Sequence, residues 1–257
     1  MHAYLGFEDY AVWFTVILLQ AALVPILFQS GNYRQFPSFT AYAGFCLVRS
    51  VILLSVSGNP TTYFELYWAG QFVEVLLALL VVRELFARVM RPFGWIPPEV
   101  VPSLITAGLT TALAAALLAF SLPVAEKYPV MAFWMSFERV SGVLLLAGFA
   151  GVAVLASIAS SPWPRSAFGI ELGFLFYLTL HAISETVAST SPNPRPIQLV
   201  GRTAFVVALV IWSVHLWKPE PVGAKLPENI MDIDRLRDRL QEQERAHAGK
   251  RRGVSRR

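Results

Sequence analysis

Long apolar runs alternate with short polar breaks along most of the chain. Each run holds about 20 mostly apolar residues or more, the length that a helix needs to cross a bilayer. The runs lie at approximately 10–30, 36–58, 62–86, 99–122, 129–160, 167–189 and 196–217. The breaks contain turn-forming residues, as at Ser30-Gly31-Asn32 and Gly58-Asn59-Pro60. The pattern predicts an all-α domain of residues 1–217 with seven transmembrane helices, and the short loops predict antiparallel neighbours.

A polar tail, residues 218–257, follows the last run. Its first part is rich in proline, and the pattern that follows predicts an amphipathic helix at about 228–247. Ile233, Leu236 and Leu240 in this helix have the spacing of a short coiled-coil seam. The helix either contacts a partner, in a homodimer or with another membrane protein, or lies on the membrane surface or on the protein's own inner face, and the sequence leaves both readings open. The tail is too short for a kinase, a cyclase or another folded output domain.

The composition excludes an ordinary soluble enzyme and a disordered chain. Of the 257 residues, 55% are apolar and only 15% are charged, and the mean hydropathy is +0.54. Soluble domains carry roughly a quarter charged residues, and disordered chains are poor in apolar ones. The composition therefore predicts a polytopic membrane protein whose first partner is the lipid bilayer.

The distribution of charge predicts the orientation of the chain. The net charge is +4, and the tail from Lys218 onward holds eleven Lys and Arg against seven Asp and Glu, so the first 217 residues are neutral. Lys and Arg concentrate on the cytoplasmic side of membranes. We therefore expect a cytoplasmic C-terminus, with the basic tail near anionic lipid, and an N-terminus outside. The expected location is a bacterial inner membrane, and nucleic acid is not an expected partner.

Ionisable side chains inside the predicted spans are the candidate functional residues. A charge at the centre of a span costs about 2.5–3.5 kcal/mol, so it normally faces a partner or a cavity. The rise of a helix places most of these groups in the middle or the outer half of the membrane. The set consists of Arg49, Glu74, Glu138, Arg139, His181, Glu185 and Arg202.

Helical spacing adds further polar side chains to the same faces. Tyr67 and Gln71 share a face with Glu74 in the third span, and Tyr177 shares one with His181 in the sixth. These faces predict a polar pocket that opens outward and takes a small polar ligand or a proton. The alternative is a set of buried ion pairs that fixes the register of the helices and binds nothing.

Several cofactors do not fit the pattern. Retinal needs a lysine within a span, and every lysine lies outside the spans. One haem would need two histidines at similar depth, but His181 and His215 differ in depth by about 16 Å. The single cysteine, Cys46, excludes an internal disulfide. No metal site and no catalytic motif stands in a plausible context, so we expect no cofactor, no catalytic residue and no enzymatic activity.

The layout of the chain resembles a known class of bacterial proteins. The third run begins Tyr63-Phe64-Glu65-Leu66-Tyr67-Trp68 and ends Val82-Arg83-Glu84-Leu85-Phe86, which looks like the corresponding helix of small bacterial membrane proteins. Over residues 10–245 the architecture resembles the seven-transmembrane sensor modules that precede histidine kinases and cyclases. The resemblance implies an outside N-terminus, a coiled helix after the seventh span and a signalling role. The chain departs from that class because no output domain is expected.

Three functions remain open from the sequence. The leading hypothesis is a receptor-like or sensor-like protein whose tail helix contacts a partner. The alternative is an accessory subunit of a larger membrane complex, which fits the small residues Gly142, Gly148 and Gly151 of the fifth span, because such residues let helices approach closely in lipid. The third is a transporter or channel, although the chain shows no inverted repeat.

Overall fold

The computed structural model describes residues 7–90, 129–158, 163–190 and 195–218. Within these ranges the regular secondary structure is α-helical and includes no strand, so the predicted all-α class is confirmed there. The helices are α1 (Phe7–Gln29), α2 (Asn32–Gln35), α3 (Pro37–Ser55), α4 (Pro60–Met90), α6 (Pro129–Ile158), α7 (Arg165–Thr190) and α8 (Arg195–Leu216). The chain divides into two units, Met1–Glu220 and Pro221–Arg257. The second unit, with the predicted tail helix, lies outside the described residues.

The breaks between the first helices use the residues that the sequence offers for turns. Gly31 has a φ of 75° between α1 and the short α2, a left-handed conformation that glycine adopts without a steric penalty. Pro37 and Pro60 stand at the starts of α3 and α4, where a missing N–H leaves no helical hydrogen bond unmade. The side chain of Asn59 accepts a hydrogen bond from the backbone N–H of Thr62 at 3.3 Å and caps α4.

Five of the described helices are long and apolar enough to cross a membrane. They contain Tyr10–Gln29, Pro37–Ser55, Ala132–Ser157, Arg165–Val187 and Leu199–Leu216. The third predicted span, 62–86, lies within α4, which is helical over 31 residues but is not one of the five and carries five charged residues. The fourth predicted span, 99–122, lies outside the described residues. The described residues thus supply five helices of a multi-pass membrane protein, and the number of seven spans stays a prediction.

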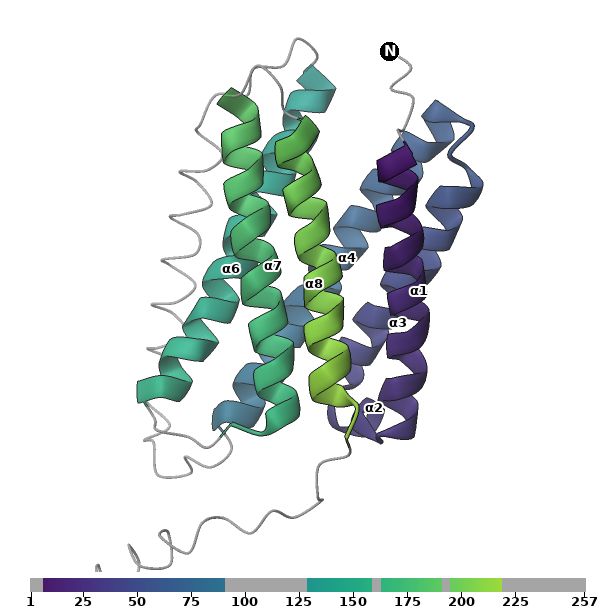
Figure 1. Ribbon diagram of the computed structural model, residues 1–257. Helices are drawn as coiled ribbons and strands as arrows, with labels where there is room; N and C mark the ends of the chain where they lie inside the picture. Colours follow the sequence, from purple (N-terminus) through teal and green to yellow (C-terminus); the bar gives the residue numbers. More distant parts are fainter. Residues whose placement is uncertain (1–6, 91–128, 159–162, 191–194, 219–257) are drawn as a thin grey trace, which may run out of the picture. The chain divides into compact units, whose positions relative to one another are not determined.

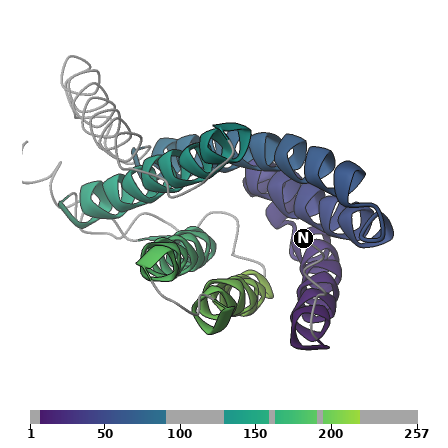
Figure 2. The same cartoon turned by 90° about the horizontal axis from the view of Figure 1, so that it is seen from above.

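The six long helices close a ring. Contacts join α1 to α3, α3 to α4, α4 to α6, α6 to α7, α7 to α8, and α8 back to α1, and Figure 2 shows this order from above. In Figure 1, α1, α4, α6 and α8 run in one direction and α3 and α7 return. We call the end of the ring where α1 begins the N-terminal end, and the end where α8 finishes the C-terminal end.

An aromatic core fills the middle of the ring. Phe149 of α6 stacks on Phe174 of α7 with ring centroids 4.3 Å apart, and Phe174 lies 4.9 Å from Trp212 of α8. Phe39 of α3 meets Trp212 edge to face at 5.2 Å. The indole N–H of Trp212 donates to the carbonyl of Ile170 at 3.1 Å, so its one polar group is satisfied although the ring is buried. Side chains from four helices therefore close the interior at this level.

A cluster of polar side chains holds the last turn of α8. The buried amide of Asn32 donates to the hydroxyl of Ser30 at 2.8 Å and to the carbonyl of Leu216 at 3.1 Å. Arg165, at the start of α7, donates to the carbonyl of Val214 at 3.0 Å. These bonds satisfy carbonyls that have no partner inside the helix, and they tie the end of α8 to α2 and α7.

Glycines let α7 and α8 approach closely. A Cβ atom on Gly173 would overlap the Trp212 ring, and one on Gly169 would overlap His215. The sequence pointed to the glycines of α6, and the described residues show a close approach for one of the three. Gly148 lies 3.2 Å from Val82, measured from an ideal Cβ position, whereas Gly142 and Gly151 have no such neighbour within 4 Å among the described residues. Glycine in an apolar run marks a close approach only where another helix crosses it.

Large apolar side chains cover the outside of the ring. Leu18 is 70% exposed, and Val154 and Val214 are more than half exposed. Such side chains occur on each of the six long helices. Exposed apolar side chains on every one of these helices suit lipid rather than water.

Candidate functional site

A cavity of about 520 Å³ lies inside the ring, and all six long helices contribute to its lining. Most lining residues of α1 and α8 belong to the first halves of those helices, and most of those of α3 and α7 to the second halves. The cavity is therefore at the N-terminal end of the ring, next to the aromatic core. Its volume falls within the range of about 300–1,000 Å³ that is typical of small-molecule sites.

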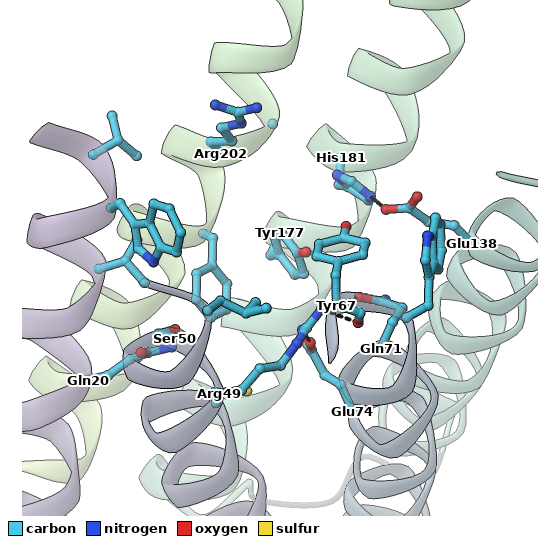
Figure 3. A pocket seen from close by; sticks show the side chains of 18 of the residues that line it. Gln20, Arg49, Ser50, Tyr67, Gln71, Glu74, Glu138, Tyr177, His181 and Arg202 are labelled. Carbon is cyan, nitrogen blue, oxygen red and sulfur yellow. Dashed lines mark hydrogen bonds and ion pairs between the residues drawn. The ribbon is translucent and has the colours of Figure 1, made fainter. Parts of the chain in front are cut away.

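Arg49 and Glu74 form the most strongly connected part of the cavity wall. The guanidinium of Arg49 on α3 makes an ion pair with Glu74 on α4. It also donates to the Gln71 side chain at 3.1 Å and to the Tyr67 carbonyl at 3.2 Å. The hydroxyl of Tyr42 donates to the second oxygen of Glu74 at 3.2 Å. The two charged side chains are only 14% and 15% exposed, so these bonds replace the hydrogen bonds to water that both groups lose on burial (Figure 3).

Gly70 makes room for Arg49 against α4. An ideal Cβ at Gly70 would lie 2.6 Å from Nε of Arg49 and 2.8 Å from its Cδ, so the arginine packs directly on the helix backbone. The guanidinium carbon lies 5.0 Å from the centroid of the Tyr67 ring, which is cation–π geometry. The close packing leaves Nε of Arg49 buried without a hydrogen-bond partner among the described residues.

His181 and Glu138 form a second, looser pair across the cavity. Nε2 of His181 on α7 lies 3.7 Å from a carboxylate oxygen of Glu138 on α6, which is beyond hydrogen-bond distance. Both side chains are about a quarter exposed, at 25% and 26%. The ring of Tyr177 stacks on that of His181 one turn away, with centroids 5.5 Å apart. This pair has space around it, whereas Arg49 and Glu74 are packed.

The structure brings most of the predicted residues to the cavity. Glu185 lines it together with the two pairs above. Arg202 and the three predicted supporting residues, Tyr67, Gln71 and Tyr177, also line it (Figure 3). Arg139 is not among the lining residues, although it follows Glu138 directly. Successive residues on a helix point about 100° apart, so depth in the membrane alone could not separate these two.

Sequence reasoning missed the wall that α1 provides. Trp13 and Gln20 line the cavity, and Trp13 meets Tyr63 of α4 edge to face at 6.3 Å. Gln20 is 2% exposed, and its carbonyl oxygen has no hydrogen-bond partner among the described residues. The signal was present in the sequence, because Gln20 is an amide in the middle of an otherwise apolar run.

The two membrane histidines lie at different levels of the ring. His181 lines the cavity, whereas His215 packs against Gly169, twelve residues earlier on α7. Twelve residues of helix span about 18 Å. Among the described residues, no three His, Cys, Asp or Glu side chains converge in a way that would hold a metal ion.

The comparisons with known proteins leave the site to be interpreted from its own chemistry. No protein-family model, no curated protein and no solved structure matches the chain.

Proposed function

We propose that the protein is a receptor-like or sensor-like membrane protein, without enzymatic activity, that binds a small polar ligand in the cavity. The observation that carries this proposal is a cavity of about 520 Å³ lined by charged side chains from five different helices. Charged groups are costly inside a membrane and are retained where they meet a ligand, a partner or water.

The packing of the two ion pairs favours a ligand site over a set of ion pairs that only fixes helix register. Arg49 and Glu74 are packed and bonded in the manner of a structural pair. His181 and Glu138 are separated by 3.7 Å and are about a quarter exposed, so the imidazole and the carboxylate can form further hydrogen bonds with a molecule in the cavity. A purely structural pair would be expected to close that gap, because unsatisfied buried polar groups are unfavourable.

The proposed topology has seven spans, with the N-terminus outside and the C-terminus cytoplasmic. α1 begins at one end of the ring and α8 finishes at the other, as expected for termini on opposite sides (Figure 1). α4 finishes at the C-terminal end, whereas α6 begins at the N-terminal end (Figure 1). These positions support the proposal of a further span at 99–122 between α4 and α6. In this topology the cavity opens from the outer half of the membrane.

The proposed route from the cavity to the cytoplasm is α8. Its first half carries Arg202 and Phe205 of the cavity wall, and its end is fastened by Asn32 and Arg165. A shift of α8 on ligand binding would reach the tail directly. We propose that the tail helix, with Ile233, Leu236 and Leu240 on one side, transmits that shift to a second copy or to another membrane protein.

The test is native mass spectrometry of the full chain released from its own membrane. The wild type is compared with Ser50→Phe, which places a ring in the cavity, and with Val48→Phe, which adds the same ring to an exposed position on the same helix. The expected result is a reproducible small adduct on the wild type and on V48F that is lost from S50F. An adduct retained by S50F, or none on the wild type, contradicts the proposal. A fixed set of other chains that survives detergent exchange favours an accessory subunit instead.

A further inference from the structure

We propose that the cavity selects an organic cation, such as an amine or a quaternary ammonium group, over neutral and anionic molecules. This inference rests on the proposed function and names the class of ligand for the same site. It is carried by the charge of the lining, by the partners of the two pairs and by the aromatic walls.

Carboxylates outnumber guanidinium groups in the lining. Three carboxylates, those of Glu74, Glu138 and Glu185, face two guanidinium groups, those of Arg49 and Arg202. A cation can be paired with the excess carboxylate, whereas an anion would add a further negative charge beside it in a setting of low dielectric constant where like charges repel strongly.

The guanidinium of Arg49 has more hydrogen-bond and ion-pair partners than the carboxylate of Glu138. The positive charge of Arg49 is matched by Glu74, and its Nη donors are directed to Gln71 and to the Tyr67 carbonyl. Glu138, in contrast, has His181 at 3.7 Å as its ion-pair contact within the described part of the chain. The buried carbonyl oxygen of Gln20 is a further acceptor in the lining without a partner there. Glu138 and Gln20 therefore present hydrogen-bond acceptors to the cavity, which suit a cation that carries donors.

Aromatic side chains form much of the remaining wall. They come from α1, α4, α7 and α8, and they are Trp13, Tyr63, Tyr67, Trp68, Tyr177 and Phe205. Aromatic faces attract cations, most strongly when water is excluded, and cages of such rings are used to bind quaternary ammonium groups. The structure already holds one cation in this way, since Arg49 lies over the Tyr67 ring at 5.0 Å.

The same lining is unsuited to a bare metal ion. A divalent metal requires several converging oxygen, nitrogen or sulfur ligands. Within the described ranges no such group of three is present. A diffuse organic charge needs only a nearby carboxylate and aromatic faces, and the cavity supplies both.

The test compares three probes of nearly the same shape and different charge. Choline carries a positive charge, 3,3-dimethylbutan-1-ol replaces its nitrogen by carbon, and 3,3-dimethylbutanoate is negative. Each is titrated calorimetrically into the full-length protein in a non-ionic detergent, which avoids the choline headgroups of common lipids. We expect choline to bind at least about ten-fold more tightly than the neutral isostere, and the carboxylate to bind most weakly.

Two variants locate the effect in the cavity. Glu138→Gln removes a lining carboxylate without changing its shape, and it should weaken choline binding about ten-fold while leaving the neutral isostere unaffected. Glu65→Gln removes an exposed carboxylate outside the lining and should leave both affinities unchanged.

Two results would overturn the cation assignment. Equal or tighter binding of the isostere or the carboxylate would refute it and still leave a ligand-binding cavity. No saturable binding of choline, or of the larger benzyltrimethylammonium, would also refute it. In that case native mass spectrometry still tests the proposed function, because a small adduct on the wild type would show that the cavity binds another class of ligand.

Discussion

Individual charged side chains make the cavity polar. Among them, Arg49 and Glu74 are the most tightly held by hydrogen bonds and packing. Each charge is largely removed from water and depends on the other, on Gln71 and on Tyr42. Removing one partner of a buried pair leaves an uncompensated charge, which typically costs about 3–5 kcal/mol, whereas removing both is far less harmful. Stability should therefore respond to these two residues as a unit.

A double-mutant cycle measures this coupling. Arg49→Gln and Glu74→Gln should each lower the free energy of unfolding by about 3 kcal/mol, and the double variant should lose less than the sum by at least about 1 kcal/mol. The measurement is reversible unfolding of the purified protein in detergent. Strictly additive losses would mean that the two side chains do not act as a pair.

The sequence identified those residues of the cavity whose side chains are unfavourable in lipid. It did not identify residues whose side chains are common in membrane helices. Charged residues such as Arg49 and His181 stand out in apolar runs because burying them requires a partner. Trp13 gave no such signal, because aromatic residues are common throughout membrane helices. Gly70 was not predictable either, since its role exists only once the Arg49 side chain lies across α4.

At the scale of elements, helix positions followed from the sequence but helix neighbours did not. Apolar run length and the turn residues around Gly31 and Pro60 place the described helices to within a few residues. The short α2 was not predicted, because four residues carry no periodicity. The contacts of α4 with α6 and of α8 with α1 join segments far apart in sequence, and only three-dimensional packing determines them.

The α7–α8 contact gives a prediction for glycine substitutions. Gly173→Ala would push a methyl group into the buried Trp212 ring, and overpacking of this kind costs about 1–3 kcal/mol. Gly151→Ala on α6 meets no atom within 4 Å in the described part of the chain, so it should leave stability unchanged or raise it by up to about 1 kcal/mol, because alanine favours helix. Thermal unfolding of the two variants side by side measures the difference. A larger loss for G151A than for G173A would show that α7 and α8 are not packed in this way.

At the scale of the whole molecule, the described ring has a polar cavity at one end and an apolar exterior throughout. The proposed orientation puts the loop after α3 outside and α2 inside. In a Cys46→Ala background, Gly58→Cys should react with a membrane-impermeant maleimide on intact cells, and Arg34→Cys only after permeabilisation. Both positions are exposed, so access to water is matched. Labelling in the reverse order would invert the topology and place the cavity on the cytoplasmic side.

The most direct measurement asks whether the cavity holds water that is continuous with the outside. Cys46, the single cysteine, lines the cavity, so the wild type already carries a probe. Ser50→Cys adds a second lining probe, and Ala208→Cys places a thiol in the fully buried interior of α8; both variants are made in the Cys46→Ala background. A small, water-soluble thiosulfonate applied from outside should modify S50C rapidly and leave A208C unmodified. Reaction of S50C as slow as that of A208C would mean that the cluster is a dry set of ion pairs and that no ligand enters it.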